Sequence, residues 1–297
     1  MPSTHNQGAF LNLPADMSDP RDARAVVLPV PYEATTSYVR GTARGPRSIL
    51  AASAQVEWYD EARGDEPCRR GISTLAPLDC DGAPEDVVGR IAGVVEAHVG
   101  DGRFVLALGG EHTLTVGCAA GAEAAGPLTI VQIDAHADLR DEYQGSPWSH
   151  ACVMRRLAGR FPIVQIGIRS MSAEEAAFSE EANGLLCVTG REIAAARCEP
   201  GGCLVWVERA VQAIETERVY LSVDLDGLDP SVVPAVGTPE PGGLLWNEAL
   251  AFVRTLFESR KVVSADVVEL CPRSGTVRSD FAAARLAYKI VGHALRA

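Results

Sequence analysis

Short apolar runs alternate with longer segments of helical periodicity along most of the chain. Seven runs are apolar at nearly every position, as expected of parallel strands that are covered on both faces. They span residues 25–30, 103–110, 128–134, 161–168, 185–189, 218–226 and 261–270. Amphipathic helices are predicted over residues 85–99, 150–159, 203–215, 246–259 and 279–295.

This alternation predicts an α/β fold in which helices cover both faces of a mainly parallel sheet. A chain of 297 residues suits one large domain better than two. We expect a single catalytic domain over residues 25–297. Residues 1–24 are polar and contain prolines, which favours an N-terminal arm.

Charged residues follow four of the predicted strands. In an open parallel sheet, ligands bind outside the carboxyl ends of the strands. The residues at these ends are Glu111 and His112, then His136 and Asp138, then Asp226 and Asp229, and finally Glu269. Four strand ends therefore offer ligand-type side chains to one edge of the sheet.

Six of the residues near these ends have the chemistry of metal ligands. They are His112, Asp134, His136, Asp138, Asp224 and Asp226. Side chains two apart on an extended backbone point to one face, so each Asp-rich cluster converges if its strand continues. A single Asp at such a place is often a helix cap, but capping does not explain three clusters at successive strand ends.

Four carboxylates in one low-dielectric site would repel one another, and a pair of divalent cations would remove that cost. Carboxylate oxygens and imidazole nitrogens together suit Mn²⁺ or a similar ion. Two such ions, about 3.5–4 Å apart, can share a water and lower its pKa toward neutrality. A metal-bridged hydroxide is then the implied nucleophile.

Four motifs resemble, in this order, those of the ureohydrolase family of arginases and agmatinases: GGEHTLT, IDAHADLRDEYQGSPWSHACVMRR, SVDLDGLDPSVVPAVGTPEPGG and DVVELCP. Residues 28–49 also resemble the agmatinase branch, and the resemblance covers roughly residues 25–295. It implies the arginase-like fold, a three-layer α/β/α sandwich, and two Mn²⁺ ions per chain. Such enzymes commonly form trimers or hexamers, so the resemblance implies a homotrimer or homohexamer.

The resemblance also assigns the metal ligands. One ion would be held by His112, Asp134, Asp138 and Asp224, and the other by Asp134, His136, Asp224 and Asp226. Asp134 and Asp224 would bridge the two ions, and Asp138 would also orient the bridging hydroxide. Two positions depart from the family pattern, because Glu111 and Thr113 stand where Asp and Ser are usual.

The remaining site residues are implied by the same motifs. Glu269 would receive the substrate's guanidinium, whose planar donors suit a carboxylate. His150 would carry a proton to the departing amine, since its ordinary pKa lies near neutrality. Thr238 would contact the substrate or the bridging ligands. Attack on the guanidinium carbon would release urea and an amine.

The substrate is the more open question. Ser170 and Ser172 stand where the arginase pattern carries Asp, so the handles for arginine are absent. Asp141 and Glu142 would suit a substrate with a cationic far end, such as agmatine, which would yield putrescine for polyamine biosynthesis. The alternative is that these two acids are simply solvated. Aminopropylagmatine, guanidinobutyrate, guanidinopropionate and arginine remain alternative substrates.

Two other function classes are disfavoured. An amide deacetylase with a single zinc ion would need fewer ligands, and a non-catalytic relative would be expected to lack some of them.

A formal net charge of −12 disfavours binding to nucleic acid or anionic membranes. The chain has neither a signal-peptide pattern nor an apolar stretch of about 20 residues. Its eight scattered cysteines form no CxxC motif, which favours mostly buried thiols in a reducing cytoplasm.

Overall fold

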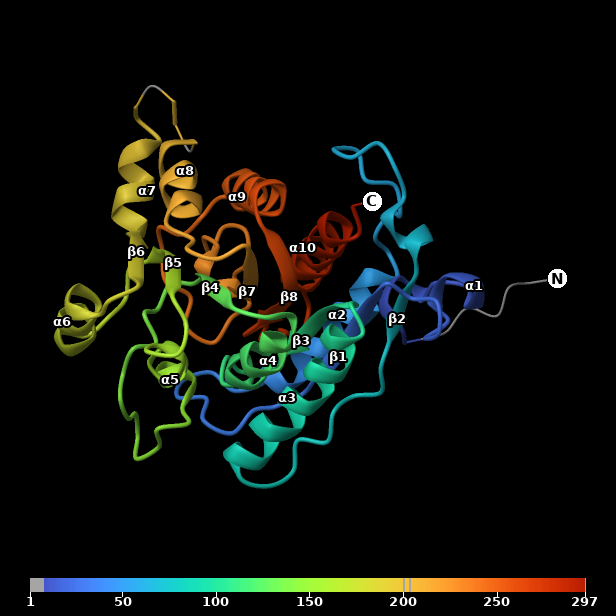
Figure 1. Ribbon diagram of the computed structural model, residues 1–297, viewed down its shortest axis with the longest axis horizontal. Helices are drawn as coiled ribbons and strands as arrows, with labels where there is room; N and C mark the ends of the chain where they lie inside the picture. The colour runs from blue at the N-terminus through green and yellow to red at the C-terminus, as the bar shows by residue number, and fades with distance from the viewer. Residues whose placement is uncertain (1–7, 200, 203, 297) are drawn as a thin grey trace.

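A central sheet of eight parallel strands forms the middle layer of the molecule (Figure 1). The computed structural model describes residues 8–199, 201–202 and 204–296. The strands lie in the order β2-β1-β3-β8-β7-β4-β5-β6. They are β1 (Ala25–Val30), β2 (Ile72–Thr74), β3 (Phe104–Gly109), β4 (Leu128–Ile133), β5 (Ile163–Ile168), β6 (Leu185–Thr189), β7 (Arg218–Asp224) and β8 (Lys261–Val268). All seven predicted strands are confirmed, and β2 is added at one edge.

Helices cover both faces of this sheet, as predicted (Figure 1). They are α1 (Ala15–Ser18), α2 (Gly45–Ser53), α3 (Pro84–Gly100), α4 (Leu114–Ala122), α5 (Val153–Leu157), α6 (Ala173–Glu181), α7 (Gly190–Ala196), α8 (Leu204–Gln212), α9 (Trp246–Ser259) and α10 (Arg278–Ala294). The five predicted helices correspond to α3, α5, α8, α9 and α10. Helix α5 is shorter than expected, because a 3₁₀ turn over His150–Cys152 precedes it.

Each face of the sheet has its own hydrophobic core. On one face, helices α2, α7, α8, α9 and α10 bury residues such as Ile49, Phe252 and Ile290. On the other, α3, α4 and α5 bury residues such as Ile91 and Leu114. Strands in the middle are buried along their whole length, which explains their continuous apolar runs. The three-layer α/β/α sandwich is therefore confirmed.

The beginning of the described chain is packed rather than extended. Phe10, Leu11 and Leu13 are buried in the core that includes α2 and α10. The Leu11 N–H donates to Ser53 Oγ at 2.8 Å, which ties this segment to α2. An arm was expected over residues 1–24, but within this range Phe10, Leu11 and Leu13 belong to the core. Residues 1–7 lie outside the described part.

Four neighbouring strands in the middle of the sheet, β3, β8, β7 and β4, end at the same edge. Two glycines let the chain pass closely there. A Cβ on Gly110 would lie 2.0 Å from the Tyr32 carbonyl oxygen, and one on Gly227 would lie 2.7 Å from Asp134 N. Larger residues at these positions would push apart the segments that carry the polar strand ends.

None of the described helices is both long and apolar enough to cross a bilayer.

A buried ion pair joins α10 to the loop that follows α2. Lys289 Nζ lies 2.9 Å from Asp60 Oδ1, and the two residues are 4% and 1% exposed. Lys289 also lies 3.0 Å from the exposed Glu61 Oε1. Two buried charges compensate each other here. Without Lys289, the Asp60 carboxylate would keep the N–H groups of Ala62 and Arg63 as donors but would lose its buried counter-charge.

We predict that Lys289→Met lowers the free energy of unfolding by about 3–5 kcal/mol, because Asp60 would remain buried and unpaired. Urea denaturation followed by circular dichroism measures this change. Arg285→Met is the matched control on the same helix, because the partner of Arg285, Glu61, is largely exposed and such pairs contribute about 0–1 kcal/mol. A loss below about 1 kcal/mol for Lys289→Met would contradict the prediction.

Candidate metal centre

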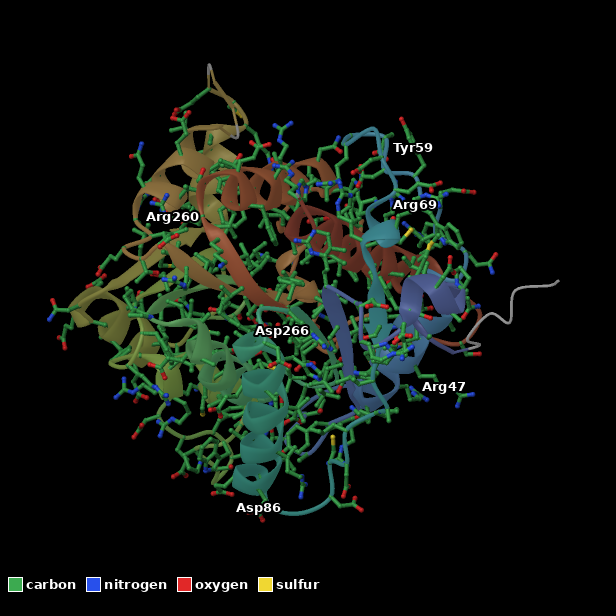
Figure 2. The ribbon with its side chains drawn as sticks, turned by 45° about the vertical axis from the view of Figure 1, so that its right-hand side comes forward. Arg47, Tyr59, Arg69, Asp86, Arg260 and Asp266 are labelled. Carbon is green, nitrogen blue, oxygen red and sulfur yellow. The ribbon has the colours of Figure 1, made fainter. Side chains whose placement is uncertain are left out.

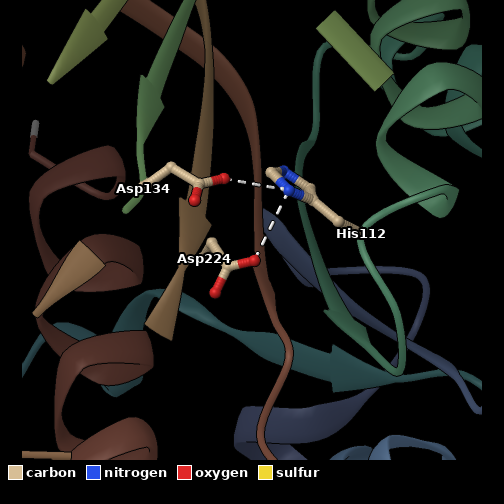
Figure 3. A group of neighbouring side chains, drawn as sticks. All are labelled: His112, Asp134 and Asp224. Atoms are coloured by element: carbon tan, nitrogen blue, oxygen red, sulfur yellow. Dashed lines mark ion pairs between the residues drawn. The ribbon is translucent and has the colours of Figure 1, made fainter. Parts of the chain in front are cut away.

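One group of potential metal ligands joins the ends of β3, β4 and β7 (Figure 3). His112 Nδ1 lies 3.1 Å from Asp134 Oδ2 and 3.5 Å from Asp224 Oδ2. Asp138 Oδ2 is 3.0 Å from the same nitrogen. All four side chains are buried. The structure therefore brings together the four residues that were predicted to hold the first ion.

A second group lies on the other side of Asp134. It consists of Asp134, His136 and Asp226. His136 Nδ1 is 3.0 Å from Asp226 Oδ2 and 3.6 Å from Asp134 Oδ1. Asp134 thus directs Oδ2 to the first group and Oδ1 to the second. This is the arrangement expected of a bridging carboxylate, whereas the predicted second bridge, Asp224, is grouped only with His112 and Asp134.

The backbone achieves this convergence differently from the predicted extended strands. Strand β4 ends at Ile133, and Asp138 has a left-handed backbone with a φ of +53°. Strand β7 ends at Asp224, and Asp226 lies in the 3₁₀ turn that follows. The Asp226 N–H donates to Asp224 Oδ1 at 2.9 Å. The premise of alternating side chains on continued strands was therefore wrong. Turns, rather than strand pleating, aim these carboxylates.

The donor set fits a divalent cation. His112 Nδ1 is buried and has no hydrogen-bond partner among the described residues, although three carboxylate oxygens lie 3.0–3.5 Å away. Neighbouring ligand atoms on an octahedral ion with bonds of about 2.1 Å are about 3 Å apart, so this spacing suits an ion between them. An imidazole nitrogen that faces only carboxylates and makes no aligned hydrogen bond is suited to bind a metal ion through its lone pair.

A cavity of about 220 Å³ opens above the two groups. Its floor includes His112, His136, Asp138, Asp224 and Asp226. Its walls include Glu269, Thr238 and His150. Three predicted substrate and proton-transfer residues therefore face the space next to the potential metal ligands.

Glu269 has an unusual backbone for a carboxylate residue. Its φ is +65°, in the left-handed region that L residues rarely occupy, and it follows β8 directly. Glu269 Oε1 accepts the His112 N–H at 2.8 Å. Asp138 and Glu269 are thus both held at a cost in backbone energy, and such strained residues cluster at functional sites.

His150 reaches the cavity from a 3₁₀ turn. Ser149 caps this turn, because its side chain accepts the Ala151 N–H. The ring of His150 lies edge-on to the Tyr143 ring, with centroids 6.0 Å apart. Burial lowers the pKa of the His150 imidazole below its ordinary value. Its position beside the potential metal ligands agrees with the prediction that placed it in the site.

Three of the predicted polar residues lie away from the cavity. Glu142 is exposed and is not among the residues that line it. Asp141 is held by an ion pair with Arg156. Asp229 organises a loop, because its carboxylate accepts N–H groups from Ser231, Gly242 and Gly243. The alternative that Asp141 and Glu142 serve no substrate agrees with these positions.

Comparison with known proteins identifies the family. The model of the arginase family matches residues 23–292. The chain belongs to the arginase family. It is therefore a hydrolase of the ureohydrolase group, whose members act on guanidino compounds. The chain is 44% identical over 281 residues to the N(1)-aminopropylagmatine ureohydrolase of Synechocystis sp., covering 92% of this chain and 89% of that protein.

Two further comparisons agree with this assignment. An N(1)-aminopropylagmatine ureohydrolase of Thermus thermophilus is 37% identical, over 91% of this chain and 90% of its own length. The crystal structure of the agmatine ureohydrolase of Thermoplasma volcanium superposes with a TM-score of 0.83 at 31% identity, covering 97% of this chain and 94% of that one. Both the fold and the family inferred from the motifs are confirmed.

The charges of this arginase-family site are unbalanced in the absence of cations. Burial, followed by the charge of Asp134, raises the pKa of Asp138 to about 7. Burial and repulsion from Asp226 and Asp134 raise the pKa of Asp224 well above its ordinary value. Cations between these groups would replace the protons that otherwise relieve the repulsion.

A buried network behind His112 was not predicted from the sequence. His112 Nε2 contacts Ser222 Oγ at 2.8 Å, and Ser222 Oγ donates to Asp266 Oδ1 at 2.8 Å. Asp266 also accepts hydrogen bonds from Thr115 and Tyr220, and it is completely buried. In Figure 2, Asp266 lies in the interior, in contrast to the exposed Asp86. An acidic residue inside the apolar run of β8 was the available signal.

This network orients the ring of His112. The imidazole directs Nδ1 to the carboxylates because Nε2 is held by Ser222. A second contact orients the shared carboxylate, since Gln132 Nε2 donates to Asp134 Oδ2 at 2.6 Å. Such partners behind the metal ligands fix ring and carboxylate orientation, and their removal commonly weakens metal binding 10- to 100-fold, as an order of magnitude.

We predict that Asp266→Asn weakens binding of the cation beside His112 by about 10- to 100-fold, because Ser222 loses its charged acceptor. Isothermal titration of the metal-free protein with Mn²⁺ measures this. Ser264→Ala on the same strand is the matched control, because its hydroxyl donates to the Val105 carbonyl rather than toward His112. Equal affinities of Asp266→Asn and the wild type would refute an orienting role.

Proposed function

We propose that the protein hydrolyses the guanidino group of N(1)-aminopropylagmatine to urea and the corresponding amine. Agmatine, the substrate favoured by the sequence motifs, is the second candidate and has the same guanidino head. The observation that carries the proposal is the carboxylate of Asp134, which two histidine-containing groups share beneath a cavity. The other members of these groups line that cavity together with Glu269. The relatives named above favour the longer substrate.

Two Mn²⁺ ions are the proposed cofactors. Asp134 would bridge them, with His112, Asp138 and Asp224 on one side and His136 and Asp226 on the other. When bound, such ions lower the pKa of a water held between them, so that it can attack at neutral pH. Nitrogen and carboxylate donors without thiolates suit Mn²⁺. Asp138, from its left-handed turn, would accept a hydrogen bond from this water.

Glu269 would bind the guanidinium. Burial raises the pKa of its carboxyl well above the ordinary value, and the charge of Glu111 adds to this effect. A guanidinium would supply the missing positive charge through hydrogen bonds to the carboxylate. Gly237 leaves room beside the Glu269 carboxylate, because a Cβ at position 237 would lie 3.9 Å from Glu269 Oε2. Thr238 Oγ1, 3.4 Å from Asp226 Oδ2, would border the same space.

His150 would transfer a proton to the departing nitrogen. It lines the cavity on the side of Tyr143. An amine leaves the collapsing intermediate readily only when it is protonated, and an imidazole near neutrality can supply that proton. His150, rather than the metal ligands, is therefore the proposed proton-transfer residue.

The outer part of the cavity suits an uncharged or cationic chain better than an amino acid. Tyr38, Tyr143 and Met171 line it with apolar and aromatic surface, and Ser170 lines it where an arginase carries Asp. Tyrosine rings attract cations such as the ammonium groups of a polyamine. The Ser172 hydroxyl caps α6 by accepting the Glu175 N–H, which removes it from substrate binding.

Other aspects of the proposal follow from the family. They are a cytoplasmic location, assembly as a homotrimer or homohexamer, and a role in polyamine biosynthesis. A deacetylase with a single zinc ion is disfavoured, because two ligand groups share Asp134. A binding protein without activity is disfavoured because the described site contains every predicted ligand.

We predict that the Mn²⁺-loaded protein releases urea from aminopropylagmatine with a kcat/KM about 10-fold above that for agmatine. Values for guanidinobutyrate, guanidinopropionate and arginine should be at least about 100-fold lower. The Arg140 guanidinium, which lines the cavity and could bind a carboxylate, is already paired with Glu175 at 3.5 Å. Each ten-fold step corresponds to about 1.4 kcal/mol in transition-state binding. A colorimetric urea assay over this panel measures these ratios.

The panel is repeated with Glu269→Gln, which should lower kcat/KM for the best substrate by about 100-fold or more, because a buried charge pair is lost. Glu174→Gln, an exposed carboxylate on α6, is the control for the substitution itself. Absence of urea from every compound would reject the proposed reaction. A preference for arginine would reject the proposed substrate class.

A further inference from the structure

A buried carboxylate, Glu111, anchors the covering segment, residues 34–39, of which residues 36–39 line the cavity. Glu111 Oε2 accepts the N–H groups of Ala34 and Thr35, both at 2.7 Å. Oε1 accepts the hydroxyls of Thr35 and Thr113, both at 2.8 Å. The residue is completely buried. All of these neighbours donate, so the Glu111 carboxylate acts only as an acceptor.

The backbone brings this segment close enough for these bonds. The Glu111 N–H donates to the Tyr32 carbonyl at 2.9 Å, and Gly110 lacks a side chain where that carbonyl passes. Glu111 then extends past its own backbone to reach residues 34 and 35. An Asp, as in the usual family pattern, would hold its carboxylate about 1.5 Å closer to its own backbone. The longer side chain therefore suits the reach to this segment.

Thr35 links Glu111 to His150. Thr35 Oγ1 lies 3.1 Å from His150 Nδ1 and also accepts the backbone N–H of His150 at 3.0 Å. A hydroxyl has one proton, and that of Thr35 is directed to Glu111 Oε1. Thr35 Oγ1 can therefore only accept from the imidazole. A hydrogen bond at this distance requires that Nδ1 carries a proton.

We infer that Glu111 and Thr35 are positioning residues that hold neutral His150 in the tautomer protonated at Nδ1. This leaves Nε2 bare, so that it can take up a proton from solvent and then pass that proton to the departing nitrogen. This inference rests on the proposed function for the identity of the reaction, but the tautomer itself does not depend on it. The hydrogen bond made by one ring nitrogen determines which nitrogen is protonated. The chain of contacts from the Glu111 carboxylate through the Thr35 hydroxyl to the His150 imidazole thus determines which ring nitrogen takes part in proton transfer.

The surroundings of Nε2 agree with this assignment. Its one described neighbour within hydrogen-bond distance is Ser37 Oγ at 3.4 Å, in an exposed position. His150 and Ser37 both line the cavity. The bare nitrogen of the neutral ring therefore faces the space where substrate binds, and Nδ1 faces the protein. With the opposite tautomer, Nδ1 would place a lone pair 3.1 Å from Thr35 Oγ1, which has no proton to offer, and the Ser149 hydroxyl could donate only from the longer distance of 3.4 Å.

The tautomer can be measured directly. Protein labelled with ¹⁵N in its histidine rings and loaded with diamagnetic Mg²⁺ is observed by two-dimensional NMR, because protonated and bare ring nitrogens have well-separated shifts. The spectrum of His150→Gln assigns the His150 signals. We expect a protonated Nδ1 and a bare Nε2 at a pH where the ring is neutral. A protonated Nε2 with a bare Nδ1 in the wild type would overturn the inference.

Kinetics of three Thr variants test the consequence. Thr35→Val removes the hydroxyl and keeps the branched shape. We expect kcat to fall by about 10- to 100-fold with KM changed less than about three-fold, since positioned proton transfer contributes about 10²–10⁴. Thr35→Ser restores the hydroxyl and should recover kcat to within about three-fold. Thr42→Val is the matched control, because the buried Thr42 hydroxyl has no hydrogen-bond partner among the described residues.

Each outcome decides between the alternatives. Loss of the Nδ1 proton signal in Thr35→Val and in Glu111→Gln supports the inference. Wild-type turnover and an unchanged tautomer in both variants would overturn it. If Thr35→Val does not fold, the wild-type tautomer and the kcat of Thr35→Ser still decide. If no guanidino compound releases urea, the proposed function fails, whereas the NMR result stands alone for the tautomer.

Discussion

The repulsion among buried carboxylates at the ends of β4 and β7 is the constraint on which the site depends. Asp134, Asp138, Asp224 and Asp226 are almost completely buried, and the imidazoles of His112 and His136 lie 3.0 Å from the carboxylates of Asp138 and Asp226. Burial, followed by repulsion from neighbouring carboxylates, raises the pKa of Asp224 and of Asp226. A fold that places so many acids together is stable at neutral pH only if cations are bound or protons are taken up. The site therefore favours the binding of divalent cations.

The rest of the structure keeps this arrangement from relaxing. Asp138 and Glu269 are held in left-handed backbone conformations, which cost on the order of 1–3 kcal/mol each unless the surroundings enforce them. The network from Asp266 through Ser222 fixes His112 from behind. Above the site, Glu111 pins the covering segment to the same strand end. The packed sheet compensates for strain and charge that are concentrated at one edge.

The layers of the fold could be predicted from the sequence because long apolar runs and amphipathic helices have clear periods. Helix α4 was missed because it is buried nearly all round and lacks a polar face. Helix α6 was missed because its sequence, AEEAAFSEE, has almost no apolar stripe, and a capping box at Ser172 marks its start. Strand β2 has three residues, too few to show a period.

The potential metal ligands could be predicted because their types and spacing carry chemistry. Their geometry could not, since the turns that aim Asp138 and Asp226 depend on tertiary contacts rather than on strand alternation. The same limit applies to Asp266 and Thr35, whose roles arise from residues far apart in the chain. Glu142 shows the converse case, because proximity in sequence to a ligand motif did not place it in the cavity.

We propose that the Asp134 carboxylate is shared between two cations. Anomalous diffraction at the manganese edge, from crystals grown with Mn²⁺, tests it most directly. We expect two peaks per chain, one beside His112 and one beside His136, with the Asp134 carboxylate between them. A single peak per chain at saturating Mn²⁺, or two peaks of which neither contacts Asp134, would contradict it.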